Sequence, residues 1–127
     1  MSEEAISAQR RRILCTEDDG DTRVLLRLLL ALQGFEVICA ENAKHAISLA
    51  RSSSFDLYLL DHWLPDIAGD VLCTKFREFD PLTPILFYSG AAYESDKARA
   101  MAAGAQGYVV KPADPDELVS EILRLVH

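Results

Sequence analysis

Acidic, hydroxyl and amino side chains follow four short apolar segments of this sequence. One segment ends in Asp61, another in Glu17 and Asp18, a third in Ser89 and a fourth in Lys111. Charged side chains are costly to bury unless a partner compensates them. Their repeated position after apolar segments therefore indicates a common use.

The three carboxylates and their neighbours suit the chemistry of a phosphoryl group. Carboxylates within about 5 Å of one another repel unless a proton or a cation intervenes. The oxygen-only set of Glu17, Asp18 and Asp61 suits Mg²⁺ as that cation. A phosphoryl group beside the metal needs further donors, which the hydroxyl of Ser89 and the ammonium of Lys111 can supply. Because carboxylates form acyl phosphates, Asp61 is the candidate nucleophile.

Each of these residues taken alone has a more ordinary explanation. Lys111 would be a surface lysine, Ser89 would belong to a turn before Gly90, and Asp18-Asp19 would favour the start of a helix. Their joint occurrence at four segment ends favours the functional interpretation, provided that the fold brings these ends together.

The apolar pattern alternates between short blocks and helical stretches. The blocks predict strands at residues 13–16, 36–40, 57–60, 85–88 and 108–110. Between and after them we expect helices at residues 21–33, 43–51, 69–79, 93–103 and from 115 to the end of the chain. Five such repeats predict a single α/β domain, a three-layer αβα sandwich with a parallel sheet between helices. Strand carboxyl ends meet at one crevice in such sheets, and ligands bind there.

Two of the expected helices begin at a residue that can cap them, and two are expected to end at a glycine, Gly34 and Gly104. Asn42 and Asp114 are suitable N-caps, and Pro115 suits the first helical position. Gly34 is expected to end the helix at 21–33. At 100° per residue this helix carries more apolar surface than one core face needs, so Val24 and Leu28 are expected to be at least partly exposed.

Composition argues against several other functions. The net charge is −7, which argues against direct nucleic-acid binding by this domain. The apolar stretch of residues 24–32 is too short to span a membrane. Three cysteines without metal or disulfide spacing indicate reduced, buried thiols and a cytoplasmic location. The three scattered histidines are expected at the surface rather than as metal ligands: His45, His62 and His127.

Four motifs in this order resemble the receiver domain of two-component response regulators, similar to the single-domain chemotaxis regulator. They are ILCTEDD, LLDHWLPDIAG, PILFYSG and GYVVKP. The resemblance covers about residues 11–126 and implies a receiver domain at 11–127 after a flexible tail at 1–10. It also implies a flavodoxin-like sheet of order 2-1-3-4-5.

The resemblance further implies a role for each site residue. Asp61 would be the phosphoacceptor, Lys111 the invariant lysine, and Ser89 and Tyr108 the switch residues. The Mg²⁺ ligands would be Glu17, Asp18, Asp61 and the backbone carbonyl of Trp63. The family also has a cis peptide bond before the proline of its last motif, so we predict a cis Lys111–Pro112 bond.

The implied function is a phospho-switch that assists its own phosphorylation and autodephosphorylation. A histidine kinase or histidine phosphotransfer protein would donate the phosphoryl group, and an unknown downstream protein would bind the switched surface. Within the family, alignment of the helix at 21–33 places Leu25, Leu26 and Leu29 against the sheet. Val24 and Leu28 would then be free to dock the donor.

Two alternatives share this kind of sheet. An aspartyl-phosphate phosphohydrolase usually carries a second aspartate two residues after its nucleophile, where this chain has Trp63. A flavin-binding module would need a Ser/Thr/Gly-rich phosphate loop after the first strand, where Glu17 and Asp18 would repel the phosphate. Both alternatives are weaker than the receiver interpretation.

Overall fold

Five strands alternate with five helices in the structure, a computed structural model that describes residues 10–126. The strands are β1 (Arg12–Thr16), β2 (Glu36–Ala40), β3 (Leu57–Leu60), β4 (Ile85–Ser89) and β5 (Gly107–Val110). The helices are α2 (Gly20–Leu32), α3 (Ala43–Ser52), α4 (Gly69–Phe79), α5 (Glu94–Ala103) and α6 (Pro115–Leu125). The tail predicted at residues 1–10 falls almost wholly outside the described residues, as does His127.

Local capping explains where several helices begin and end. The side chain of Asn42 accepts a hydrogen bond from the amide of His45, and that of Asp114 accepts one from Asp116, as predicted. Asp19 caps α2 in the same way. Gly34 follows α2 with a φ of 88°, a left-handed conformation that favours glycine, so the predicted stop is confirmed.

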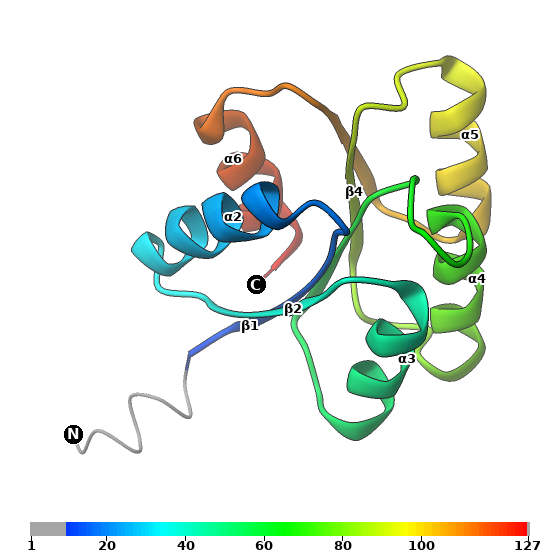
Figure 1. Cartoon of the computed structure of the whole chain (residues 1–127), viewed down its shortest axis with the longest axis horizontal. Helices are drawn as coiled ribbons and strands as arrows, with labels where there is room; N and C mark the ends of the chain where they lie inside the picture. Colours follow the sequence, from blue (N-terminus) through cyan, green and yellow to red (C-terminus); the bar gives the residue numbers. More distant parts are fainter. Residues whose placement is uncertain (1–9, 127) are drawn as a thin grey trace.

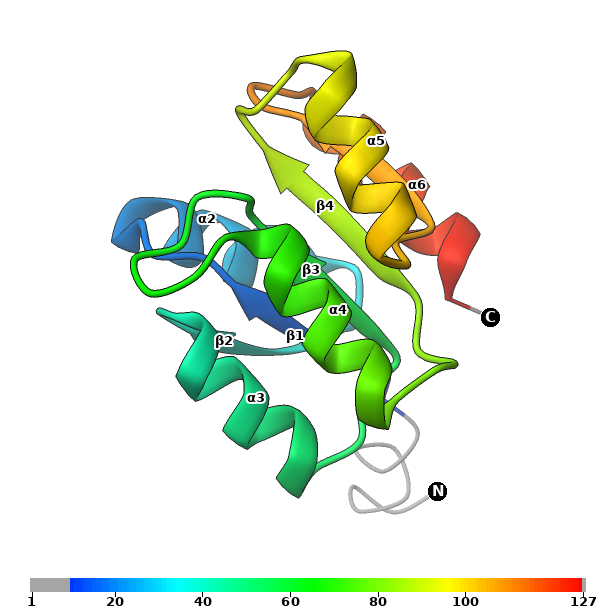
Figure 2. The ribbon, with the colours of Figure 1, turned by 90° about the vertical axis from the view of Figure 1, so that its right-hand side faces the viewer.

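The strands form one parallel sheet of order β2-β1-β3-β4-β5, which confirms the predicted order. Helices α2 and α6 cover one face of the sheet, and α3, α4 and α5 cover the other (Figure 1). Figure 2 shows the three helices of the second face side by side along the sheet. The three-layer αβα sandwich is therefore confirmed.

Each face of the sheet has its own apolar core. On one side Leu26 and Leu30 of α2 pack with residues of α6. On the other, small residues of α3 and large ones of α4 pack against the sheet together with Ala100 of α5. The prediction for α2 was partly wrong: Leu25 is 61% exposed, and Leu30 takes the inward position one helical turn after Leu26. Val24 and Leu28 are exposed, as predicted.

Two of the three cysteines are buried, as predicted. All three cysteines are free; Cys15 and Cys73 are buried, whereas Cys39 is only half-buried because β2 is an edge strand. No helix within residues 10–126 is long and apolar enough to cross a membrane.

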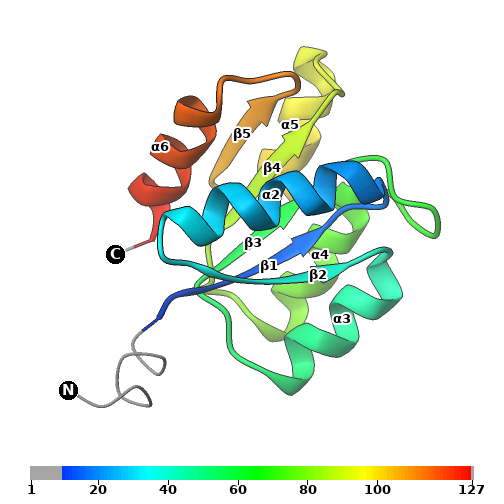
Figure 3. The same cartoon turned by 60° about the vertical axis from the view of Figure 1, so that its left-hand side comes forward.

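The strand register decides which residues meet at the carboxyl edge of the sheet. Thr16 pairs with Leu60 across β1 and β3, so the residues that follow them, Glu17 and Asp61, lie side by side. Ser89 pairs with Val110 across β4 and β5, which brings Lys111 to the same edge. Figure 3 shows β1, β3, β4 and β5 side by side in the sheet, with the loops that follow them at one end of it.

Candidate functional site

A cluster of three carboxylates lies at the carboxyl edge of β1 and β3. Glu17, Asp18 and Asp61 can each offer one oxygen, and these oxygens all lie within 4.8 Å of one another. Glu17 and Asp61 are buried and Asp18 is exposed. Burial raises the pKa of Glu17, and the neighbouring charge of Asp61 adds to the rise. The cluster therefore has an excess of negative charge that a cation would relieve.

Lys111 reaches the two buried carboxylates from the end of β5. Its Nζ donates to Oε1 of Glu17 and lies 3.1 Å from Oδ2 of Asp61. Burial alone would lower the pKa of Lys111, but these two carboxylates raise it above the ordinary value. The ammonium group therefore stays charged, and it holds both carboxylates in place. The Lys111–Pro112 peptide is cis, as predicted.

Ser89 meets Asp61 from the other side. The hydroxyl of Ser89, fully buried, donates to Oδ1 of Asp61 over 2.6 Å. The amide of Trp63 donates to the same oxygen over 3.2 Å. Burial opposes ionisation of Asp61, but the Ser89 hydroxyl, the Lys111 charge and the Trp63 amide together hold its pKa below the ordinary value. Asp61 is therefore an ionised carboxylate with a defined orientation.

Tyr108 lies on β5, where its partner in the sheet is Phe87 of β4, two residues before Ser89. Its ring stacks on that of Phe87, with centroids 5.6 Å apart and planes within 2° of each other. Its hydroxyl donates to the carbonyl of Ala91 over 2.5 Å, and the amide of Ala91 in turn donates to Oγ of Ser89. The two residues named as switch residues from the sequence are thus linked through one loop residue.

One prediction about this region was wrong. His62 was expected at the surface, but only 5% of it is exposed. Its ring packs 4.6 Å from that of Phe87, and its Nε2 lies 3.1 Å from the carbonyl oxygen of Asp96. His62 is buried because Phe87, Tyr108 and the start of α5 surround its ring, and its neighbours in the sequence do not indicate these contacts. His45 is exposed, as expected.

Two further residues, Asp66 and Gly69, shape the loop after Asp61, although no role at the site was predicted for either from the sequence. A Cβ added at Gly69 would lie 2.1 Å from the carbonyl oxygen of Asp61, so only glycine allows this close approach. The carboxylate of Asp66 accepts hydrogen bonds of 2.9 Å from the amides of Ala43 and Lys44, at the start of α3. Together they fix the loop between β3 and α4 against its neighbours.

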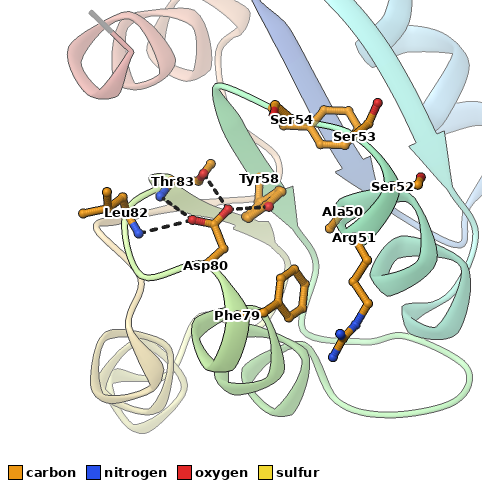
Figure 4. A pocket seen from close by; sticks show the side chains of 11 residues that line it. Ala50, Arg51, Ser52, Ser53, Ser54, Tyr58, Phe79, Asp80, Leu82 and Thr83 are labelled. Atoms are coloured by element: carbon orange, nitrogen blue, oxygen red, sulfur yellow. Dashed lines mark hydrogen bonds between the residues drawn. The ribbon is translucent and has the colours of Figure 1, made fainter.

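A second hollow lies at the opposite end of the sheet. Its volume is about 720 Å³, and it lies between the ends of α3 and α4 (Figure 4). The carboxylate of Asp80 at its wall accepts hydrogen bonds from the hydroxyls of Tyr58 and Thr83, each over 2.6 Å. It also accepts from the amides of Leu82 and Thr83. Since these bonds occupy the carboxylate, the cluster stabilises a loop rather than offering a reactive group.

The fold and the strand-end cluster match a known family. A family model described as the response regulator receiver domain matches residues 13–123. The chain therefore belongs to the receiver domains of two-component response regulators. Receiver domains are phospho-switches rather than ordinary enzymes, and they bind Mg²⁺ at an acidic cluster. The oxygen-only donor set of this chain fits such an ion.

Curated relatives and solved structures agree with this assignment. The chain is 36% identical over 115 residues to the cell cycle transcriptional regulator CtrA of Caulobacter vibrioides; the match covers 91% of this chain and 50% of CtrA. The chain thus spans about half the length of the curated relatives it matches.

Among solved structures, chemotaxis protein CheY4 of Vibrio cholerae aligns with a TM-score of 0.88 and 26% identity, over 92% of this chain and 99% of CheY4. Response regulator TrrA from Thermotoga maritima, solved in complex with Mg²⁺ and BeF, aligns with a TM-score of 0.83 and 30% identity. That alignment covers 91% of this chain and 99% of TrrA.

Proposed function

We propose that Asp61 is the phosphoacceptor of this receiver domain. The observation that carries the proposal is the pair of contacts on its two carboxylate oxygens. Oδ1 accepts the hydrogen bond from Ser89, and Oδ2 faces the ammonium of Lys111. These contacts keep the carboxylate ionised and oriented at the open edge of the sheet, as a nucleophile requires.

The reaction is the transfer of a phosphoryl group from a phosphohistidine of a histidine kinase or a histidine phosphotransfer protein. An oxygen of Asp61 forms a bond to phosphorus while the donor's N–P bond breaks, and the electron pair of that bond stays on the imidazole nitrogen. Negative charge on the transferred oxygens needs donors near it. Lys111 and Ser89 supply an ammonium and a hydroxyl for those oxygens.

Glu17, Asp18 and Asp61 are the side chains that would hold Mg²⁺, together with the backbone carbonyl of Trp63. Bound there, the ion supplies positive charge that offsets the carboxylates and the phosphoryl oxygens. The three carboxylate oxygens that lie within 4.8 Å of one another support this assignment, because a cation between them would offset their charge. Glu17 presents a carboxylate oxygen to the cluster, as Asp18 and Asp61 do.

Ser89 and Tyr108 would carry the signal outward. A phosphoryl group on Asp61 offers new acceptors to the Ser89 hydroxyl, and Ala91 links Ser89 to Tyr108. Movement along this path biases the surface formed by α5, β5 and α6 between two states. An unknown downstream protein partner would bind one of those states.

The switch resets when water attacks the phosphorus. The bond between phosphorus and the Asp61 oxygen then breaks, which restores the carboxylate and releases inorganic phosphate. The same residues that assist phosphorylation, Lys111 and Ser89, remain beside the phosphoryl group during this autodephosphorylation.

The donor would dock on the exposed side of α2. Val24 and Leu28 present apolar surface there, on the helix that begins directly after the acidic cluster. Apolar surface exposed on a helix suits packing against the helices that carry a donor histidine. The acidic net charge of −7 fits a protein partner rather than nucleic acid. We further propose that the receiver domain spans residues 11–127 and that the protein is cytoplasmic.

Labelling with a small phosphodonor tests the assignment of Asp61. The full chain is incubated with acetyl phosphate and Mg²⁺, and its intact mass is measured over time. We expect the parent to gain one phosphate and Asp61→Asn to gain none. Asp21→Asn, which alters an exposed carboxylate on α2, is the matched control and should be labelled like the parent. An Asp61→Asn variant labelled at the parent rate would sink the proposal.

A further inference from the structure

His62 occupies a position that joins the site to the rest of the protein. It follows Asp61 directly, and its amide lies 3.4 Å from Oγ of Ser89. Its carbonyl accepts a hydrogen bond of 2.8 Å from the amide of Gly69, at the start of α4. The backbone of His62 therefore shares in any movement of the residues around Asp61.

The ring of His62 contacts Tyr108, the proposed switch residue, and Phe87, on which Tyr108 stacks. Its centroid lies 4.6 Å from that of Phe87 and 5.6 Å from that of Tyr108, at interplanar angles of 42° and 41°. Aromatic pairs at these separations attract one another beyond the area they bury. Tyr108 is thus held from two sides, by the stack on Phe87 and by the ring of His62.

A polar contact ties the same ring to α5. Nε2 of His62 lies 3.1 Å from the carbonyl oxygen of Asp96. Since a carbonyl can only accept, Nε2 must carry the hydrogen. Asp96 lies in the first turn of α5, where its own carboxylate accepts from the amide of Tyr93 and from Arg99. His62 is therefore anchored to a well-held helix end.

Two routes consequently lead from Asp61 to Tyr108. The first runs from the Ser89 hydroxyl through Ala91 to the Tyr108 hydroxyl. The second runs through the next residue along the chain, His62, whose ring contacts Tyr108 and also reaches α5. A buried side chain that only filled space would not need a donor directed at a backbone carbonyl in the first turn of α5.

We propose that His62 is a positioning residue that couples the state of Asp61 to Tyr108 and to the amino end of α5. This inference rests on the proposed function, because it concerns the response of the protein to phosphorylation of Asp61. In this role the ring transmits movement to Tyr108 by contact, and the Nε2–H bond transmits it to α5. His62 itself takes no part in the transfer of the phosphoryl group.

Two substitutions separate the two contacts. His62→Leu removes both the ring contact and the donor. His62→Phe keeps a ring between Phe87 and Tyr108 but cannot donate to Asp96. His45→Phe, an equal change at an exposed position of α3, is the matched control. Each variant of this chain is labelled with acetyl phosphate and Mg²⁺, and its amide NMR shifts are recorded with and without beryllium fluoride and Mg²⁺.

We expect both His62 variants to gain phosphate at the parent rate and to show the parent's beryllium fluoride shifts at Ser89 and Lys111. In His62→Leu the shifts at residues 94–99 should be lost, and the shift at Tyr108 should be reduced, because the route through Ala91 remains. In His62→Phe the shift at Tyr108 should remain while those at residues 94–99 are lost. His45→Phe should respond like the parent throughout.

Other results would overturn the inference. If His62→Leu responds like the parent at Tyr108 and α5, the residue transmits nothing. If either His62 variant folds but loses its labelling, the residue builds the site instead of coupling it. Should His62→Leu fail to fold, His62→Phe decides, because an intact α5 response there contradicts the proposal. A parent that neither gains phosphate nor responds to beryllium fluoride would refute the proposed function, and this inference with it.

Discussion

The indole of Trp63 lies against Gly90, so that a Cβ added at Gly90 would come within 3.3 Å of Cζ3 of the indole. Trp63 nevertheless remains 63% exposed. Its ring forms one wall of a hollow of about 420 Å³ beside the site, whose other wall includes Tyr93. A large apolar side chain thus stands two residues after Asp61 and contacts the loop that follows Ser89.

This contact leads to a prediction about the lifetime of the phosphoryl group. Trp63 crowds the neighbourhood of Asp61, and Ala91 on the facing loop has no polar group to orient a water molecule. We expect Trp63→Asn to lose phosphate faster than the parent, by about tenfold, or about 1.4 kcal/mol of activation free energy. The decay of phosphorylated protein is followed by intact mass after removal of acetyl phosphate. Tyr93→Asn is the control, and an unchanged rate in Trp63→Asn would exclude shielding.

Magnesium should stabilise the fold because it relieves the repulsion among Glu17, Asp18 and Asp61. A ligand that binds only the folded state adds about 2.7 kcal/mol at 100 times its dissociation constant. Melting temperatures are compared in chelator and in millimolar Mg²⁺. Asp18→Asn removes an exposed metal ligand at little cost to the fold. It should therefore reduce the rise in melting temperature that Mg²⁺ gives the parent. Identical melting of the parent in the two buffers would argue against a metal site.

The hydrogen bond between Tyr58 and Asp80 should contribute measurably to stability. Tyr58 is almost fully buried, and its hydroxyl donates to an ionised carboxylate. Bonds of this kind contribute about 1.5–3 kcal/mol, so Tyr58→Phe should lower the free energy of unfolding by about that amount. Urea denaturation measures the difference. Tyr93→Phe, at an exposed tyrosine, should change little, and equal effects of the two substitutions would contradict the prediction.

The same pair predicts a pH dependence. Burial raises the pKa of Tyr58, and Asp80 adds to the rise; stability from this group is therefore present below about pH 10 and lost as the pH rises above it. Burial opposes ionisation of Asp80, but its hydrogen bonds hold its pKa below the ordinary value, so its contribution is lost as the pH falls below about 4. The stability difference between parent and Tyr58→Phe should be flat from about pH 5 to 9 and shrink on either side. A stability difference that grows at high or at low pH would contradict the direction assigned to the pKa shift of Tyr58 or of Asp80.

Docking of the donor on α2 can be separated from the chemistry of the site. Leu28 is 63% exposed, so Leu28→Glu should leave the fold and labelling by acetyl phosphate intact. It should slow phosphotransfer from the cognate kinase or phosphotransfer protein, because a charge would enter an apolar contact. Leu82→Glu alters an exposed leucine at the opposite end of the sheet and is the control. If Leu28→Glu also loses labelling by acetyl phosphate, Leu28 supports the fold rather than docking.

Much of this protein could be predicted from sequence because its signals are local. The caps at Asn42 and Asp114 and the glycine at Gly34 act within one helical turn, so neighbouring residues suffice to identify them. Alternating apolar blocks predicted a parallel sheet, and a parallel sheet brings strand ends together. Asp61 and Lys111 could therefore be assigned to one site although they lie far apart in the chain.

The tertiary structure decided the features that depend on contacts between distant segments. His62 is polar and follows a strand, but the approach of Phe87, Tyr108 and α5 makes its position a buried one. Leu25 and Leu30 are equally apolar, and only the rotation of α2 on the sheet determines that Leu30 is buried while Leu25 is exposed. The sequence determined the elements and the chemistry of the strand ends, because hydrogen bonding and apolar periodicity act along the chain. The packing of those elements selected the neighbours of each side chain, because close packing involves residues from several segments at once.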